Sequence, residues 1–288
     1  MKIIPALRGV LIGASLSLAG WSACAGSVFV TGHDPIWHSG IGPAKSSAAN
    51  LAKTGIEYAR NGSVLPFLFV ESKTTSIPAG NARTASFLTS ALGYADTGYV
   101  VMDAAGLAAL PDFRASLNSF SAIVVASDHG GMLGAAELGF LNAHSADVLS
   151  FLNAGGGLYA EAESNATGQI GATQPFGFLP FLVSSADFQA AETNNTLTPF
   201  GSSLGLVTGD VNGNFSHNFF SSTGGLSVVN LFNGNPARPL TLAFRGQIDV
   251  GGVVPGIPEP QTYALMLAGL GVLGAVARRR RAAGRAAA

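Results

Sequence analysis

Short apolar runs alternate with longer segments of helical periodicity between residues 26 and 162. An unbroken apolar run of four to eight residues is typical of a buried strand, and apolar residues recurring every three or four positions are typical of a helix. This pattern predicts an α/β fold with a mostly parallel sheet and helices on both faces. The predicted strands are 27–31, 64–70, 99–102, 121–127 and 158–162, and the predicted helices are 44–60, 81–92, 107–117 and 135–153.

The periodicity weakens after residue 163, where Gly, Asn, Ser and Thr become frequent. Later strands are predicted near 181–183, 226–231 and 240–244, and some of them are expected to form an antiparallel edge. A single α/β domain is predicted over residues 26–245, which is long enough to bury a sizeable core. Residues 246–257 are rich in Gly, Val and Pro, and this composition predicts a linker.

The first 25 residues have the three parts of a secretory signal peptide. A short basic start precedes an apolar run, and Ala23 and Ala25 occupy the small-residue positions of a cleavage site. The alternative is a lipoprotein acylated on Cys24, although Trp21 stands where an aliphatic residue is expected. Cys24 is the only cysteine, so cleavage after Ala25 leaves a mature chain without disulfides or thiolate ligands.

The C-terminal segment has the composition of a short membrane span. Residues 262–277 are almost uncharged and, as a helix, are about 24 Å long against a hydrocarbon core of ~30 Å. Four arginines follow and place the C-terminus in the cytoplasm by the positive-inside rule; they are Arg278, Arg279, Arg280 and Arg281. The alternative is a buried core helix with a basic tail. We expect a transmembrane helix at 262–277.

Pro258, Glu259 and Pro260 immediately precede this apolar segment and its arginine cluster. Together these features resemble the PEP-CTERM sorting domain of Gram-negative bacteria, here over residues 258–285. The resemblance implies recognition by an exosortase, after signal peptidase has removed the leader, and an inner-membrane-anchored intermediate. It also implies delivery to the cell surface or to an exopolysaccharide matrix, where exopolysaccharide or matrix proteins are the expected partners in a biofilm. Glu259 is then a substrate residue for another enzyme.

The charge distribution argues against a nucleic-acid partner. The chain has 15 basic and 16 acidic residues, and only 11% of its residues are charged. Seven of the basic residues lie before residue 26 or after residue 277, which leaves eight between these positions, where all 16 acidic residues lie. Binding to phosphates is built largely from Lys and Arg, so an acidic domain of this kind is not expected to bind nucleic acid.

Residues 121–162 carry a second resemblance. A predicted strand ends in Ser127-Asp128-His129-Gly130-Gly131, and the following helix ends at Gly155-Gly156-Gly157 before another strand. This order is similar to the class I glutamine amidotransferase-like fold, which is flavodoxin-like. Such enzymes use a nucleophilic cysteine, and the mature chain has none. The resemblance therefore implies the fold, and the missing cysteine excludes glutamine hydrolysis.

Histidines and carboxylates cluster at the carboxyl ends of predicted strands, where open α/β sheets bind their ligands. The candidate ligands for a divalent metal ion are His33, Asp34, Asp128, His129 and His217. In the alternative interpretation, Asp34 and Asp128 cap the following turns and the histidines bond to loop backbone.

Two functions follow from these features. The favoured one is a noncatalytic, exported domain that binds a ligand or partner. The alternative is an extracytoplasmic hydrolase, metal-dependent or not, for which His129, Asp128 and His217 are the catalytic candidates. No Gly-x-Ser-x-Gly nucleophile motif is present in the sequence.

Overall fold

A computed structural model describes eight stretches of the chain: residues 26–72, 85–127, 133–162, 176–179, 183–190, 194–213, 216–249 and 252–253. The predicted signal peptide and the predicted sorting tail lie outside these residues, so the transmembrane helix expected at 262–277 stays a prediction. Within the stretches above, no helix combines the length and the apolar character that a membrane span requires.

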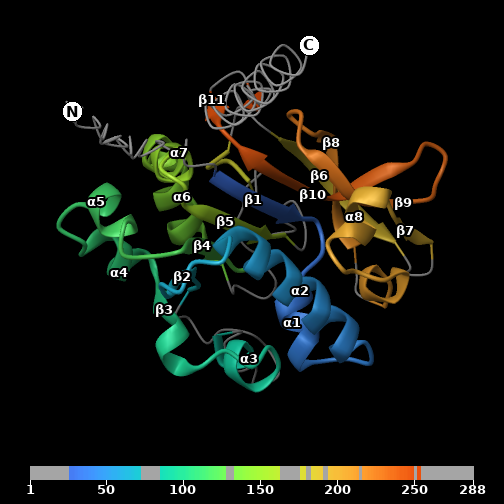
Figure 1. Cartoon of the computed structure of the whole chain (residues 1–288), viewed down its shortest axis with the longest axis horizontal. Helices are drawn as coiled ribbons and strands as arrows, with labels where there is room; N and C mark the ends of the chain where they lie inside the picture. The colour runs from blue at the N-terminus through green and yellow to red at the C-terminus, as the bar shows by residue number, and fades with distance from the viewer. Residues whose placement is uncertain are drawn as a thin grey trace, which may run out of the picture. The chain divides into compact units, whose positions relative to one another are not determined.

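The core of the domain is one eight-stranded sheet (Figure 1). The first five strands in its spatial order are mutually parallel, and the last three are joined to them by antiparallel pairing. The mostly parallel α/β architecture is therefore confirmed. In spatial order the strands are β3 (Tyr99–Met102), β2 (Phe67–Val70), β4 (Ala122–Val125), β5 (Gly157–Glu161), β1 (Gly26–Thr31), β10 (Arg238–Gly246), β9 (Ser227–Phe232) and β7 (Asn195–Leu197).

The parallel strands do not follow the flavodoxin-like order. In that order strand 1 lies between strands 2 and 3, giving 2-1-3-4-5. Here the order is 3-2-4-5-1, and β1 lies between β5 and the antiparallel β10. The antiparallel partner places the end of β1 next to the later part of the chain, which includes His217.

Helices pack on both faces of this sheet, as the alternating pattern predicts. Leu51, Ile56 and Leu88 join one apolar cluster with side chains from the strands, and Leu117 and Leu152 join the cluster on the other face. The helices of the first face are α1 (Pro35–Gly40), α2 (Lys45–Arg60) and α3 (Ala85–Ser90), and those of the second are α4 (Ala104–Ala108), α5 (Phe113–Leu117), α6 (Ala135–Ala143) and α7 (Ser145–Asn153).

Two predicted helices are each divided in two. The segment 107–117 contains the end of α4 and all of α5, because Pro111 cannot continue a helix and Asp112 starts a new one by accepting a hydrogen bond from the Ala115 N–H. The segment 135–153 is interrupted at His144, whose backbone is not helical, between α6 and α7. Both divisions leave the apolar side chains on the same face of the sheet.

A second, two-stranded sheet pairs β6 (Ser184–Ala190) with β8 (Ser216–Ser222). The backbone N–H groups of His217 and Asn218 both donate to the carbonyl oxygen of Gly32, at 2.8 and 3.1 Å. This pairing holds β8 against the segment that follows β1. The described residues also include α8 (Pro199–Ser203) and 3-10 helices at Asp96–Gly98 and Thr208–Val211.

The chain enters and leaves the large sheet at the end opposite the carboxyl ends of the parallel strands. Gly26, the first residue of β1, pairs with Gly246, the last residue of β10, whereas Thr31 pairs with Thr241. The predicted linker 246–257 contains a short hairpin of β11 (Ile248–Asp249) and β12 (Gly252–Val253). Asn153 at the end of α7 makes two hydrogen bonds with the backbone of Ile248 and thereby holds β11 against α7.

Candidate functional site

Asp34 lies three residues beyond β1 and immediately before α1. It occupies the N-cap position of this helix, and Pro35 follows at the first helical position, as is common because that position needs no N–H. An Asp at an N-cap ordinarily accepts a hydrogen bond from the second or third backbone N–H of the helix. The side chain of Asp34 makes no such bond. The capping interpretation of Asp34 is therefore wrong, and its carboxylate is directed elsewhere.

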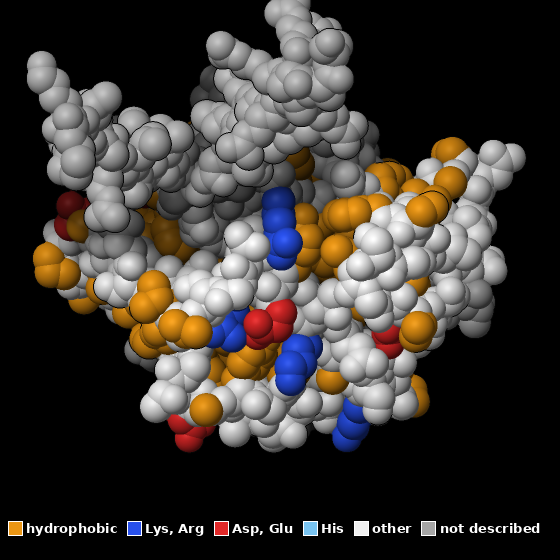
Figure 2. Space-filling model, in the orientation of Figure 1, with side chains coloured by type: hydrophobic (Ala, Val, Ile, Leu, Met, Phe, Trp, Pro, Cys, Tyr) orange, Lys and Arg blue, Asp and Glu red, His pale blue; other side chains and the backbone are white. Residues whose placement is uncertain are grey.

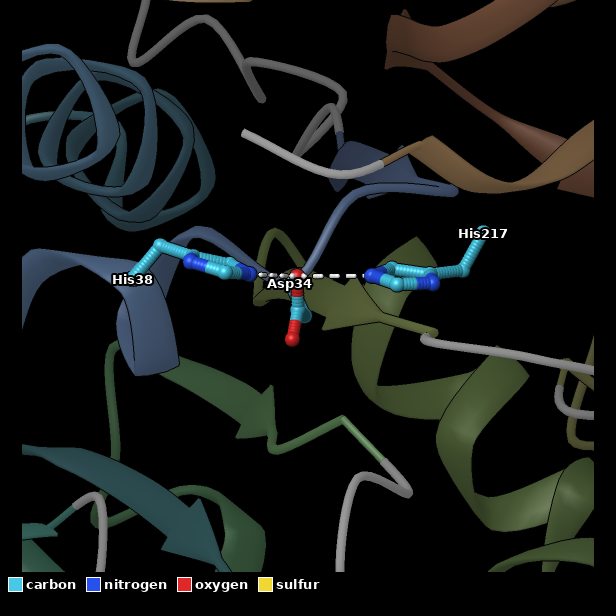
Figure 3. Close-up of side chains that lie close together, drawn as sticks. All are labelled: Asp34, His38 and His217. Atoms are coloured by element: carbon cyan, nitrogen blue, oxygen red, sulfur yellow. Dashed lines mark ion pairs between the residues drawn. The ribbon is translucent and has the colours of Figure 1, made fainter. Parts of the chain in front are cut away.

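Two histidines face the Asp34 carboxylate (Figure 3). The Nε2 atom of His38 lies 3.1 Å from Asp34 Oδ1, and the Nε2 atom of His217 lies 3.3 Å from the same oxygen. His38 comes from α1, one turn after Asp34, so the helix brings the two side chains to one side. His217 comes from β8, and its approach depends on the pairing of that strand with Gly32.

These three side chains form a compact and largely buried group. One potential donor atom from each lies within 4.8 Å of the others. The exposed fraction of the side chain is 1% for Asp34, 8% for His217 and 15% for His38. Burial raises the pKa of Asp34, but the contacts with His217 and His38 outweigh it and lower this pKa to about 2. The carboxylate is therefore charged in the folded protein at neutral pH.

Glu161, at the end of β5, takes over the capping role that Asp34 leaves open. Its Oε1 atom accepts hydrogen bonds from the Ile36 N–H at 3.0 Å and from the Tyr159 hydroxyl at 2.6 Å. Ile36 is the second residue of α1, where an N-cap side chain would ordinarily bond. Burial and the nearby charge of Asp34 raise the pKa of Glu161 well above its usual value, against the lowering effect of the Tyr159 hydrogen bond.

The structure brings together only part of the set predicted from the sequence. Asp34 and His217 meet, whereas His33 lies apart from their contact and places its Nε2 atom 3.3 Å from the Asn230 side-chain nitrogen. Asp128 and His129 lie outside the described residues. His38 was not predicted, although its i,i+4 spacing from Asp34 across a proline-initiated helix is a signal that the sequence contains.

Carboxylates at the other strand ends have structural roles. Glu71 accepts a hydrogen bond from the Ala85 N–H at the start of α3, and Asp103 accepts one from the Gly106 N–H in α4. Glu137 accepts from the Ala104 N–H, also in α4. Each of these groups satisfies a backbone N–H that a helix start leaves without an intrahelical partner. In this respect they differ from Asp34.

A shallow hollow of about 390 Å³ lies elsewhere, beside α2. Basic and acidic side chains lie close together on the face of the domain that carries α2 (Figure 2). Three charged side chains that line this hollow have partners: Lys53 donates to the Leu92 carbonyl, Arg245 donates to the Tyr58 carbonyl, and Glu57 pairs with Arg60. These charges hold neighbouring elements to α2, so the Asp34 group is the stronger candidate for a functional site.

Comparison with known proteins identifies the C-terminal segment. Residues 256–281 match the family model described as the PEP-CTERM protein-sorting motif. This range includes Pro258, Glu259 and Pro260 and the four consecutive arginines. No curated protein matches the chain. The chain therefore carries a PEP-CTERM protein-sorting motif, which supports an exported protein that passes through a membrane-anchored intermediate and is sorted by an exosortase to the cell surface.

Proposed function

We propose that the protein is exported through its N-terminal signal peptide, cleaved after Ala25, and held in the inner membrane by residues 262–277. An exosortase then processes it near Pro258-Glu259-Pro260, and the domain reaches the cell surface or an exopolysaccharide matrix in a biofilm. The observation that carries this proposal is the sorting motif matched at residues 256–281. Arg278 to Arg281, which follow the apolar segment, are in the position expected of a cytoplasmic stop signal.

In this proposal the α/β domain, residues 26–245, is a binding module rather than an enzyme. Its binding site is the carboxyl end of β1, where Asp34, His38 and His217 meet. Open α/β sheets bind their ligands at this end of the strands. The chain leaves the sheet at the opposite end, because Gly246 of β10 pairs with Gly26 of β1. The last residue of β10 and the proposed binding site are thus at opposite ends of the large sheet.

The sorting step is tested with Glu259→Ala and with a deletion of residues 258–288, in a host that has an exosortase. Both changes are expected to alter processing and abolish surface display, because they remove the recognised motif. Asp96→Ala, which changes an exposed carboxylate of the folded domain, is the control and should be displayed normally. Surface labelling and the mass of the mature chain are the measurements. Unchanged display in both tail variants would refute the sorting proposal.

A hydrolase is the second candidate, and one observation favours it. Catalytic zinc sites have three protein ligands and an open position for water, whereas structural zinc sites have four. The Asp34 group has three donors among the described residues. Hydrolysis of ester, glycoside or phosphate substrates that is lost on chelation and restored by added metal would favour the enzyme over the binding module.

A further inference from the structure

We propose that Asp34, His38 and His217 bind one divalent transition-metal ion of the zinc class. This inference rests on the binding role proposed above and names the ligand of that site. It is carried by the spacing of the three donor atoms, by the absence of a capping role for Asp34, and by the chemistry of the donor set.

The donor atoms have the spacing of ligands around one small ion. Zinc binds imidazole nitrogen and carboxylate oxygen at about 2.0–2.2 Å, so two ligands of a tetrahedral site lie about 3.3 Å apart. The two Nε2–Oδ1 separations are 3.1 and 3.3 Å. One ligand atom from each of the three residues lies within 4.8 Å of the other two. The imidazole rings approach Asp34 from two sides, from α1 and from β8 (Figure 3).

The Asp34 carboxylate is buried and does not cap the helix that it precedes. Neither of its oxygens makes a well-oriented hydrogen bond with any residue in the described part of the chain. The helix start that it would ordinarily cap is satisfied instead by Glu161, through the Ile36 N–H. A buried carboxylate is costly unless it is paired or coordinates a metal ion. A bound cation would neutralise Asp34 and would be coordinated by a carboxylate oxygen that accepts no hydrogen bond from the helix.

The donor set selects the class of ion. Two imidazole nitrogens and one carboxylate oxygen suit Zn²⁺ and the other late first-row ions, Fe²⁺, Co²⁺ and Ni²⁺. Calcium requires six to eight oxygen ligands, and magnesium prefers oxygen ligands with several waters, so neither fits a site dominated by nitrogen. Three protein ligands leave one tetrahedral position for water or for a group from a partner.

Binding would also connect distant parts of the chain. His38 and Asp34 belong to the segment that follows β1, and His217 belongs to β8 in the second sheet. The backbone N–H groups of His217 and Asn218 donate to the Gly32 carbonyl and hold the two segments together. A metal ion bound only by the folded chain stabilises it by mass action. Zinc should therefore raise the thermal midpoint of the domain.

The experiment uses the purified, untagged full chain, stripped of metal by chelation and dialysis. Zn²⁺ is titrated by calorimetry, and bound metal is counted by inductively coupled plasma mass spectrometry. We expect one equivalent of Zn²⁺ and, with Co²⁺ as the probe, the intense visible absorption of a tetrahedral site. His38→Ala, His217→Ala and Asp34→Asn should each weaken Zn²⁺ binding at least about 100-fold, since even outer-shell changes cost 10–100-fold.

His144→Ala is the matched control. His144 also pairs with an aspartate, Asp147, at 2.8 Å, but this pair is more exposed and forms no group of three His, Cys, Asp or Glu ligands among the described residues. Its removal should leave zinc affinity unchanged. His38 is the most exposed of the three proposed ligands, so His38→Ala decides the question if another variant fails to fold.

Either of two results would overturn the metal site. The first is a wild-type chain that binds no stoichiometric zinc, and the second is a folded His38→Ala variant that binds it as tightly as wild type. Normal surface display together with either result would leave the sorting proposal intact and reject the metal site alone. Loss of display in the tail variants does not depend on zinc, so the two proposals fail separately.

Discussion

The ends of β1 and β3 carry the same local pattern and use it differently. At each, an aspartate follows the strand and precedes a short helix: Asp34 before α1, and Asp103 before α4. Asp103 accepts a hydrogen bond from the Gly106 N–H at 2.8 Å and caps its helix. Asp34 makes no capping bond and instead faces two histidines. An aspartate at a helix start is thus not evidence of a cap until the helix N–H groups have been accounted for.

The difference arises from the groups that satisfy the first helical N–H donors. In α4, Glu137 accepts from the first residue, Ala104, and leaves Gly106 for Asp103. In α1, the first residue is Pro35, which has no N–H, and the second, Ile36, donates to Glu161. Each helix start is therefore held by a glutamate from a distant segment, Glu137 for α4 and Glu161 for α1. Only at α1 does the glutamate replace the aspartate as the cap, and this leaves the Asp34 carboxylate available for the site.

Among the substitutions at these two strand ends, replacement of Glu161 should lower the stability of the protein most. Glu161→Ala leaves the buried Ile36 N–H and Tyr159 hydroxyl without their acceptor, and each such loss costs about 1–3 kcal/mol. We expect the free energy of unfolding to fall by about 3 kcal/mol, measured by urea denaturation at neutral pH. Asp34 would then be the nearest replacement cap, so zinc affinity should fall as well.

Glu161→Gln is the control for that variant. It keeps an acceptor oxygen for both donors and removes a carboxyl group whose pKa is raised by burial and by Asp34. A raised folded-state pKa means that the stability contributed by the protonated acid is present at low pH and is lost as the pH rises. The stability of the glutamine variant relative to the wild type should therefore increase as the pH rises above 4.5, the ordinary value for Glu. Equal losses in the alanine and glutamine variants would show that the acceptor is not the important feature.

The second prediction concerns acid and the charge of Asp34. Its pKa is about 2 in the folded protein, against an ordinary value of 3.8, so the folded state favours the charged form. The charged Asp34 carboxylate contributes about 2 kcal/mol to the free energy of unfolding. This contribution is fully present above the unfolded-state pKa and is lost as the pH falls toward 2.

Urea denaturation of metal-free wild type and Asp34→Asn at a series of pH values measures this difference. The wild type should be the more stable at pH 6, and the gap should close as the pH approaches 2. A gap that stays constant over this range would mean that the asparagine variant loses packing or hydrogen bonding rather than charge. The charge of Asp34 would then not be what distinguishes it from Asp103.

Local signals in the sequence predicted most of the first half of the fold. The strands β1, β3 and β5 and the long helix α2 lie within a residue or two of their predicted bounds, because unbroken apolar runs and helical periodicity are local properties. Strand order is not local. The position of β1 between β5 and β10 depends on pairing with residues more than 200 positions away, which no periodicity encodes.

The site was predictable only in part. The predicted topology placed Asp34 at a strand end, and His217 was among the predicted metal ligands. The helix α1 has six residues, too few for an apolar periodicity to indicate it, so His38 was not assigned to the same side as Asp34. The role of Glu161 depends on a hydrogen bond to Ile36, which lies 125 residues away in the sequence. Such a contact becomes visible only when the strand order is known.

The smallest loss of stability is expected at the end of β3, from Asp103→Ala. Asp103 caps α4 through one hydrogen bond, and the loss of an N-cap side chain costs about 1 kcal/mol. The neighbouring bond from Ala104 to Glu137 should hold the start of α4 in place. Urea denaturation should therefore show a modest loss of stability, while calorimetry shows unchanged zinc binding. A fall in zinc affinity without unfolding would mean that the two strand ends are coupled, and that capping at β3 contributes to the site at β1.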